Sequence, residues 1–133
     1  MRLVLDTGIL MLILKGDATV KDVVETLRRV AEAYTATTNM TELYYKAEEK
    51  LGKQVAITWF NRLIRLGNLT VVPVDVKLAL RAGEFKARYR QQLSLADAII
   101  VALTEELNGC LLTTDSRLRT IKEIAVKVYE IGR

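Results

Sequence analysis

The sequence contains no histidine, and this absence excludes more classes of function than any residue that is present. Without imidazole there is no Ser-His-Asp triad, no Cys-His pair, no histidine general base and no histidine-ligated metal site. Cys110 is the only cysteine, so an internal disulfide and a multi-cysteine zinc site are excluded as well. An enzyme built from this chain must use carboxylates, hydroxyls, lysine, tyrosine or one thiol. Carboxylates without imidazole or thiolate favour hard cations such as Mg²⁺ or Mn²⁺.

Proline is also scarce, with one residue, which argues against long irregular linkers. The 133 residues, 50% hydrophobic and 27% charged, predict one folded domain over residues 1–133. The net charge of +4 is too small to indicate a nucleic-acid partner by itself. The unbroken apolar run over residues 9–14 is far shorter than the ~20 residues of a membrane helix, and Asp6 interrupts the stretch that resembles a signal peptide. We therefore expect a cytoplasmic protein with no membrane partner.

Short apolar segments alternate with amphipathic ones along the chain. The short segments predict strands over residues 2–5, 34–38, 69–74, 110–114 and 125–131. The others predict helices over residues 7–16, 17–33, 39–51, 53–66, 75–92 and 94–107, with a short helix or turn at 115–121. Strands that alternate with helices indicate an α/β fold, in which a five-stranded parallel sheet has helices on both faces.

Four acidic residues stand apart from those on the charged helix faces. Asp6 and Asp115 directly follow predicted strands, whereas Glu42 and Asp97 each lie in the first turn of a predicted helix. In an open parallel sheet the carboxyl ends of the strands and the following helix starts line one edge. Carboxylates gathered there repel one another, and one or two divalent cations would relieve that repulsion. Such a site can activate water and brace a phosphodiester during in-line attack, without histidine.

Each of these acids also has a purely structural explanation. Residues 39–42 and 94–97 have the spacing of a capping box, and Asp6 and Asp115 can serve as ordinary caps or turn residues. Four independent caps that share one sheet edge are a poorer explanation than one shared site. Thr7 and Thr113 are hydroxyls beside two of the acids, and a local bond to the backbone explains Thr7 at least as well as a role in catalysis.

Four segments of the chain resemble the signature segments of the PIN-domain ribonuclease family: LVLDTGIL, TNMTELYY, LSLADAIIVALTEELNG and CLLTTDSRL. Their order and spacing cover nearly the whole chain, and the most similar subgroup is the small VapC-type toxins of toxin–antitoxin pairs. The family fold is a five-stranded parallel sheet between helices, in agreement with the pattern above. The family's acidic positions, catalytic and metal-binding, correspond to Asp6, Glu42, Asp97 and Asp115.

The same resemblance extends to hydroxyls and partners. Thr113 stands where the family has Ser or Thr two residues before the last acid, and Thr7 matches the hydroxyl that follows the first acid. The resemblance implies a Mg²⁺- or Mn²⁺-dependent endoribonuclease with an RNA substrate. It also implies a homodimer and a small antitoxin that inserts Arg or Lys into the acidic pocket. Residues 89–94 depart from the pattern, because they lack the glycine that many relatives carry there.

Basic residues flank two of the acids and are candidate contacts for an RNA backbone: Arg81, Lys86, Arg88, Arg90, Arg117, Arg119 and Lys122. Arg117 is the first candidate because it lies nearest in sequence to a site acid, followed by Arg88 and Arg90. A solvated helix face is the alternative for each of them. Tyr89 either stacks on a base or packs against the protein.

Aromatic residues gather on two consecutive predicted helices: Tyr44, Tyr45, Trp59 and Phe60. Core packing is the first interpretation of this group. A groove for a partner helix or a homodimer contact is the second. Cys110 opens a predicted buried strand, which favours a packed thiol over a nucleophile.

Other classes fit these residues less well. A haloacid-dehalogenase-type phosphatase needs a second Asp at position 8, where the chain has Gly8. A receiver domain needs an acidic pair after the first strand, where Thr7 follows Asp6, and a Lys near the end of its last strand, where Lys127 lies too early. The remaining alternatives are a catalytically silent PIN-like module for RNA binding or protein interaction, and a housekeeping RNA-processing nuclease.

Overall fold

The fold was taken from a computed structural model, which describes residues 2–29 and 32–131. Five strands form one sheet, and every neighbouring pair is parallel, in the order β3-β2-β1-β4-β5. The strands are β1 (Arg2–Leu5), β2 (Glu32–Ala36), β3 (Leu69–Val72), β4 (Cys110–Thr113) and β5 (Ala125–Val128). The predicted five-stranded parallel α/β sheet is therefore confirmed.

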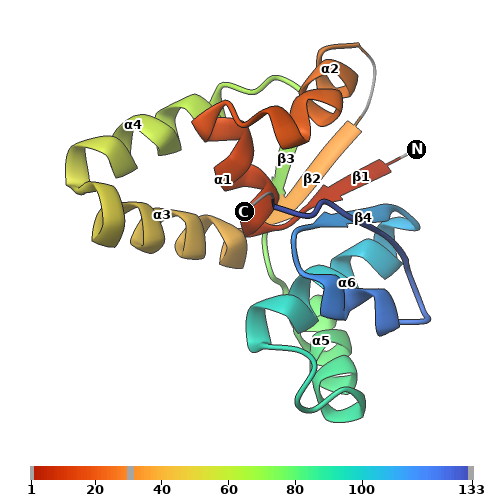
Figure 1. The fold of residues 1–133 in the computed structure, drawn as a ribbon. Coiled ribbons are helices and arrows are strands. Elements are labelled where there is room, and N and C mark those ends of the chain that lie inside the picture. Colours follow the sequence, from red (N-terminus) through yellow and green to blue (C-terminus); the bar gives the residue numbers. More distant parts are fainter. Residues whose placement is uncertain (1, 30–31, 132–133) are drawn as a thin grey trace.

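Helices cover both faces of the sheet (Figure 1). Helices α1 to α4 pack on one face, and α5 and α6 pack on the other. Their bounds are α1 (Thr7–Lys15), α2 (Lys21–Arg29), α3 (Thr37–Leu51), α4 (Lys53–Ile64), α5 (Val76–Arg88) and α6 (Leu95–Leu107). Two short 3₁₀ segments complete the chain, η1 (Ala18–Val20) and η2 (Ser116–Thr120).

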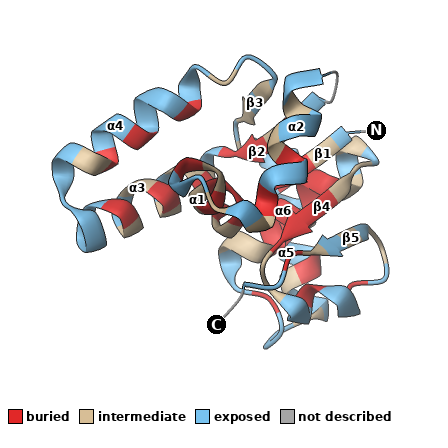
Figure 2. Cartoon of the chain, turned by 45° about the horizontal axis from the view of Figure 1, so that its top comes forward, coloured by how far each residue is buried: buried red, intermediate tan, exposed pale blue. Residues whose placement is uncertain are grey.

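The central strands β1 and β4 are buried on both faces (Figure 2). Successive side chains of a strand point to opposite faces, so Val4 and Leu111 pack with α5 and α6, whereas Leu5 and Leu112 pack with α1 to α4. This burial explains why the sequence reads as apolar runs there, without alternation. The carboxyl ends of β1 and β4 lie side by side, because Leu5 pairs with Leu112.

The second strand lies two residues earlier than the sequence predicts. Its first residue, Glu32, is exposed and pairs with Arg2 of β1, and Thr37 already begins α3. The predicted helix over 17–33 is correspondingly shorter, since η1 and α2 end at Arg29. Alanine and glutamate are weak strand formers, so the sheet pairing, not local propensity, sets this strand.

The other predicted elements are present, and several end a few residues early. Strand β3 ends at Val72, directly before Pro73, and helix α5 ends at Arg88 where the sequence predicts a helix to residue 92. None of the helices in the described ranges has the length and apolarity needed to cross a membrane.

Candidate functional site

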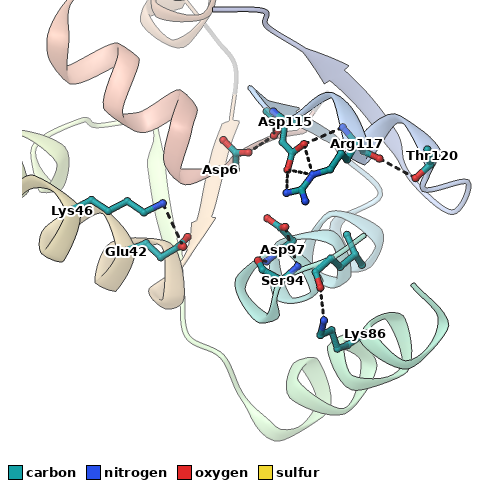
Figure 3. Close-up of polar contacts among 11 residues, drawn as sticks. Asp6, Glu42, Lys46, Lys86, Ser94, Asp97, Asp115, Arg117 and Thr120 are labelled. Carbon is teal, nitrogen blue, oxygen red and sulfur yellow. Dashed lines mark hydrogen bonds and ion pairs between the residues drawn. The ribbon is translucent and has the colours of Figure 1, made fainter. Parts of the chain in front are cut away.

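Acidic side chains from three parts of the chain lie near the carboxyl ends of β1 and β4 (Figure 3). Asp6 follows β1 directly and caps α1, since its Oδ1 accepts the Ile9 N–H at 3.1 Å. Asp115 follows β4 and caps η2 in the same way. Asp97 enters from the start of α6. The parallel topology thus brings these three predicted acids to one edge, as expected for open α/β sheets.

A buried hydroxyl joins two of the acids. Thr113 is 0% exposed, and its Oγ1 donates to Asp6 Oδ2. The same oxygen accepts the backbone N–H of Asp115 at 3.0 Å. A hydroxyl has one proton to give and lone pairs to receive, so it can serve both acids at once. Thr113 therefore fixes the position of the Asp6 side chain and of the Asp115 backbone.

The charges at this edge act on Asp6. The pKa of Asp6 is raised to about 6, mainly by burial and to a smaller extent by the negative charges of Asp97 and Asp115. The hydrogen bonds from Thr113 and Ile9 oppose that rise. A carboxyl group in this position takes up its proton near neutral pH unless a cation compensates its charge.

Asp97 is both a cap and a member of the group. Its Oδ2 accepts the Ser94 N–H at 3.1 Å, and its own N–H donates to Ser94 Oγ at 3.1 Å, which completes the predicted capping box. The apolar helix α6 packs against the sheet from Ala98 onward and carries Asp97 to the edge. Both explanations that the sequence offered, a helix cap and a site acid, therefore apply to Asp97.

Glu42 does not lie in the first turn of its helix, because α3 begins at Thr37. The capping box predicted over residues 39–42 is wrong for the same reason. Glu42 is instead held across helices: Thr7 Oγ1 donates to Glu42 Oε1 at 2.8 Å, and Lys46 Nζ lies 3.8 Å from Oε2. The predicted hydroxyl Thr7 thus binds the side chain of an acid and not the backbone.

Asn39 is a member of this network that the sequence led us to misread as a helix cap. It is 2% exposed, and its Nδ2 donates to Thr7 Oγ1 at 3.1 Å. Its Oδ1 is buried and has no hydrogen-bond partner in the described protein. A buried acceptor without a donor is what a bound water molecule satisfies. In the sequence, the only sign that Asn39 belongs to this network is its position near the start of a helix.

Arg117 binds one of the site acids. Its Nε lies 3.0 Å and 3.2 Å from the two carboxylate oxygens of Asp115, and its Nη2 lies 2.7 Å from Oδ2. These bonds hold the pKa of Asp115 below its usual range. The charge of Asp97 also raises the pKa of Arg117. Arg117, which the sequence predicts to contact RNA, is therefore bound to a carboxylate in this structure.

The other predicted basic contacts divide into paired and exposed residues. Arg88 pairs with Glu123, which also accepts the Tyr89 hydroxyl at 2.5 Å, and the tyrosine packs against the core cluster of α5 and α6. Lys86 donates to the backbone oxygens of Arg90 and Leu93 at 2.6 Å and 2.5 Å, and thereby ties the loop that precedes Asp97. Arg81 binds Glu105 with two hydrogen bonds, and Arg119 lies 3.6 Å from Glu130. Arg90 and Lys122 are exposed.

The donor set fits a hard divalent cation in its chemistry. It consists of carboxylate and hydroxyl oxygens whose charges repel one another. Within the described ranges, however, no three Asp, Glu, His or Cys side chains stand close enough together to hold an ion. Two of the acids are bound by other groups: Arg117 binds both oxygens of Asp115, and Glu42 contacts Thr7 and Lys46. An ion would have to displace Arg117 to use all of these acids.

The aromatic group is divided by its burial. Trp59 is only 7% exposed and packs in the core, as the first interpretation of the aromatic group predicts, so its alternative place on a partner surface is wrong. Tyr44 is half-buried and donates to Glu48 at 3.0 Å. Tyr45 and Phe60 are 44% and 38% exposed. Cys110 is half-buried, and burial raises the pKa of its thiol, as expected for a packed side chain.

Comparisons with known proteins agree with this architecture. A family model described as "PIN domain" matches residues 3–124. No curated protein sequence matches the chain. Among solved structures, VapBC2 from Rickettsia felis bound to a promoter DNA fragment aligns with a TM-score of 0.80 at 18% identity, covering 98% of this chain and 100% of that one.

Two further structures align over most of the chain. A toxin–antitoxin complex from Klebsiella pneumoniae has a TM-score of 0.73 at 22% identity, covering 96% of this chain and 98% of that one. VapC20 from Mycobacterium tuberculosis, described as a toxin that cleaves the sarcin-ricin loop, has a TM-score of 0.68 at 20% identity, covering 82% and 86%. At these identities the three structures establish a shared fold.

Proposed function

The chain belongs to the PIN domain family, and on that premise we propose that it is a Mg²⁺- or Mn²⁺-dependent endoribonuclease. The observation that carries the proposal is the meeting of Asp6, Asp97 and Asp115 at one sheet edge, with Thr113 joining two of them. A structural neighbour described as cleaving the sarcin-ricin loop supports RNA as the substrate.

The proposed roles follow from the contacts. Asp6, Asp97 and Asp115 would hold the ion, with Glu42 at its margin. A bound divalent ion would make a nucleophile of water at neutral pH and stabilise charge on the phosphodiester. Thr113 keeps the Asp6 carboxylate turned toward Asp115. The exposed residues Arg90 and Lys122 are available to hold an anionic backbone beside the acids.

The first experiment removes one negative charge at a time. Asp6→Asn and Asp97→Asn should each lower RNA cleavage by about 100-fold or more, since each loses a ligand for the ion while keeping its shape. Glu49→Gln is the matched control, because Glu49 is an exposed acid on α3 and should retain full activity. Cleavage at the wild-type rate in EDTA, or in both Asp variants, would contradict the proposal.

We further propose that the protein is the toxin of a VapBC-type pair in the cytoplasm. Its fold matches chains from VapBC and toxin–antitoxin complexes. The simplest inhibitor of such a site inserts an Arg or Lys among the carboxylates, where it replaces the charge of the metal. Co-expression with a small adjacent gene should yield an inactive complex whose RNase activity returns on proteolysis of the partner. A chain that is active, harmless on expression and without such a partner would indicate a housekeeping nuclease instead.

A further inference from the structure

Arg117 and Asp115 form the most complete ion pair at the site. Both carboxylate oxygens of Asp115 receive hydrogen bonds from the guanidinium, and the Arg117 N–H donates to Oδ1 at 3.0 Å. The side chain of Arg117 is 61% exposed and that of Asp115 is 26% exposed. The pair is two residues apart in one 3₁₀ segment, so it forms without help from a distant element.

The guanidinium also faces the rest of the acidic group (Figure 3). The charge of Asp97 acts on it, and Asp115 is joined to Asp6 through Thr113. Arg117 therefore supplies positive charge to Asp115 by direct contact and to Asp97 at longer range.

We propose that Arg117 is a built-in counter-cation that competes with the divalent ion for Asp115 and, once displaced, binds the phosphate of the substrate. This inference rests on the metal site of the proposed function. A carboxylate that accepts hydrogen bonds on both oxygens has fewer lone pairs for an ion, and a cation in the pocket repels a second one. The arginine is mostly exposed, so it can swing into solvent without unfolding any element.

The chemistry of the released side chain suits the second role. A guanidinium presents a planar fork of N–H groups that matches two phosphate oxygens. Arg117 begins two residues from a site acid, so its reach after release covers the space just outside the carboxylates. Arg119 lies on the same segment and is 54% exposed, but it lies 3.6 Å from Glu130 and not on a site acid. It is therefore a matched control for the loss of one positive charge.

The test measures Mn²⁺ binding by calorimetry, in the absence of RNA, for the wild type, Arg117→Gln and Arg119→Gln. Removal of a surface ion pair of this kind should tighten Mn²⁺ binding of R117Q about fivefold, the equivalent of ~1 kcal/mol, while R119Q stays close to the wild type. In the cleavage assay R117Q should show a raised KM for RNA despite its tighter metal binding, because the phosphate contact is lost. These two opposite changes in one variant are the expected result.

Each other outcome has a distinct meaning. If the wild type binds Mn²⁺ and R117Q binds it equally or more weakly, the competition is refuted while the metal site of the proposed function stands. An equal tightening in R119Q would reduce the effect to net charge and would also refute it. If none of the three proteins binds Mn²⁺ at millimolar concentration, the metal site itself fails, and this inference fails with it.

Discussion

At the scale of single residues, threonine hydroxyl groups hold the acidic side chains in place. Carboxylates cannot do this for one another because their charges repel. Thr113 lies between Asp6 and Asp115, and Thr7 lies between Asn39 and Glu42. In both cases the threonine gives its single proton to a side-chain carboxylate and accepts an N–H from the other neighbour. Each threonine thereby fixes an acidic side chain to a second part of the site.

Asp6 gives this arrangement a pH dependence. Its pKa in the folded protein is raised to about 6 from an ordinary value of 3.8. The folded state therefore holds the proton more tightly than the unfolded chain. The stability gained in this way is fully present below pH 3.8 and is lost as the pH rises through about 6. The loss amounts to at most about 3 kcal/mol for a shift of this size.

We predict that metal-free protein loses stability between pH 4 and pH 7 and that Asp6→Asn removes much of that slope. Urea unfolding in EDTA, measured on both proteins across this range, checks the prediction. The asparagine cannot ionise, so the variant should be the more stable of the two above pH 7. Parallel pH profiles for the two proteins would show that Asp6 titrates normally.

At the scale of elements, the start of α1 passes very close to the end of β4. A Cβ on Gly8 would lie 2.4 Å from Thr114 Oγ1, so Gly8 is needed for this approach. The contact holds the chain after Asp6 against the chain before Asp115. Gly83, in the middle of α5, has open space at its Cβ position and makes no such demand.

We predict opposite effects for alanine at these two glycines. Gly8→Ala should destabilise the fold by about 1–3 kcal/mol through overpacking and should lower activity, whereas Gly83→Ala should stabilise it by up to about 1 kcal/mol through helix propensity. The double variant Gly8→Ala/Thr114→Ala removes the clashing hydroxyl and should recover most of the loss. Chemical unfolding of the four proteins tests this, and an unaffected G8A variant would disprove the close approach.

At the scale of the whole molecule, α3 and α4 extend away from the sheet (Figure 1) and expose much of their outer surface (Figure 2). Large apolar side chains lie exposed on them: Tyr45, Leu51, Ile57, Phe60 and Ile64. We define these five residues as the α3–α4 surface. An exposed group of this kind is typical of a protein–protein contact, and the proposed antitoxin or a second copy of the chain would cover it.

We predict that the isolated protein is a dimer in sedimentation and that Phe60→Glu weakens it about tenfold or more, because a buried aromatic anchor is replaced by a charge. Leu80→Glu is the comparison, since Leu80 is 68% exposed on α5, away from the α3–α4 surface. Dissociation by L80E, with F60E unaffected, would move the dimer contact to α5. A wild-type monomer at all concentrations would refute the dimer and leave the surface to the antitoxin.

The order and type of most elements, and the sheet edge at which Asp6 and Asp115 lie, follow from the amino-acid sequence alone. Both results depend on local properties: apolar runs predict buried strands, and a residue that directly follows a parallel strand must lie at its carboxyl end. The capping box around Asp97 was equally local and is found as predicted. The bounds of β2 do not depend on local properties alone, because Glu32 and Ala33 enter the strand through pairing with β1.

The contacts of each acid depend instead on how distant segments pack in the folded chain. Thr113 reaches Asp6 across 107 residues of sequence, and Thr7 reaches Glu42 across 35. The core position of Trp59 and the buried amide of Asn39 likewise depend on which neighbouring helix covers them. Periodicity specifies which face of an element is apolar, but not which side chain stands opposite. Hydrogen bonds and ion pairs need a few ångströms of accuracy between distant segments, and only the packing of this sheet and its helices supplies it.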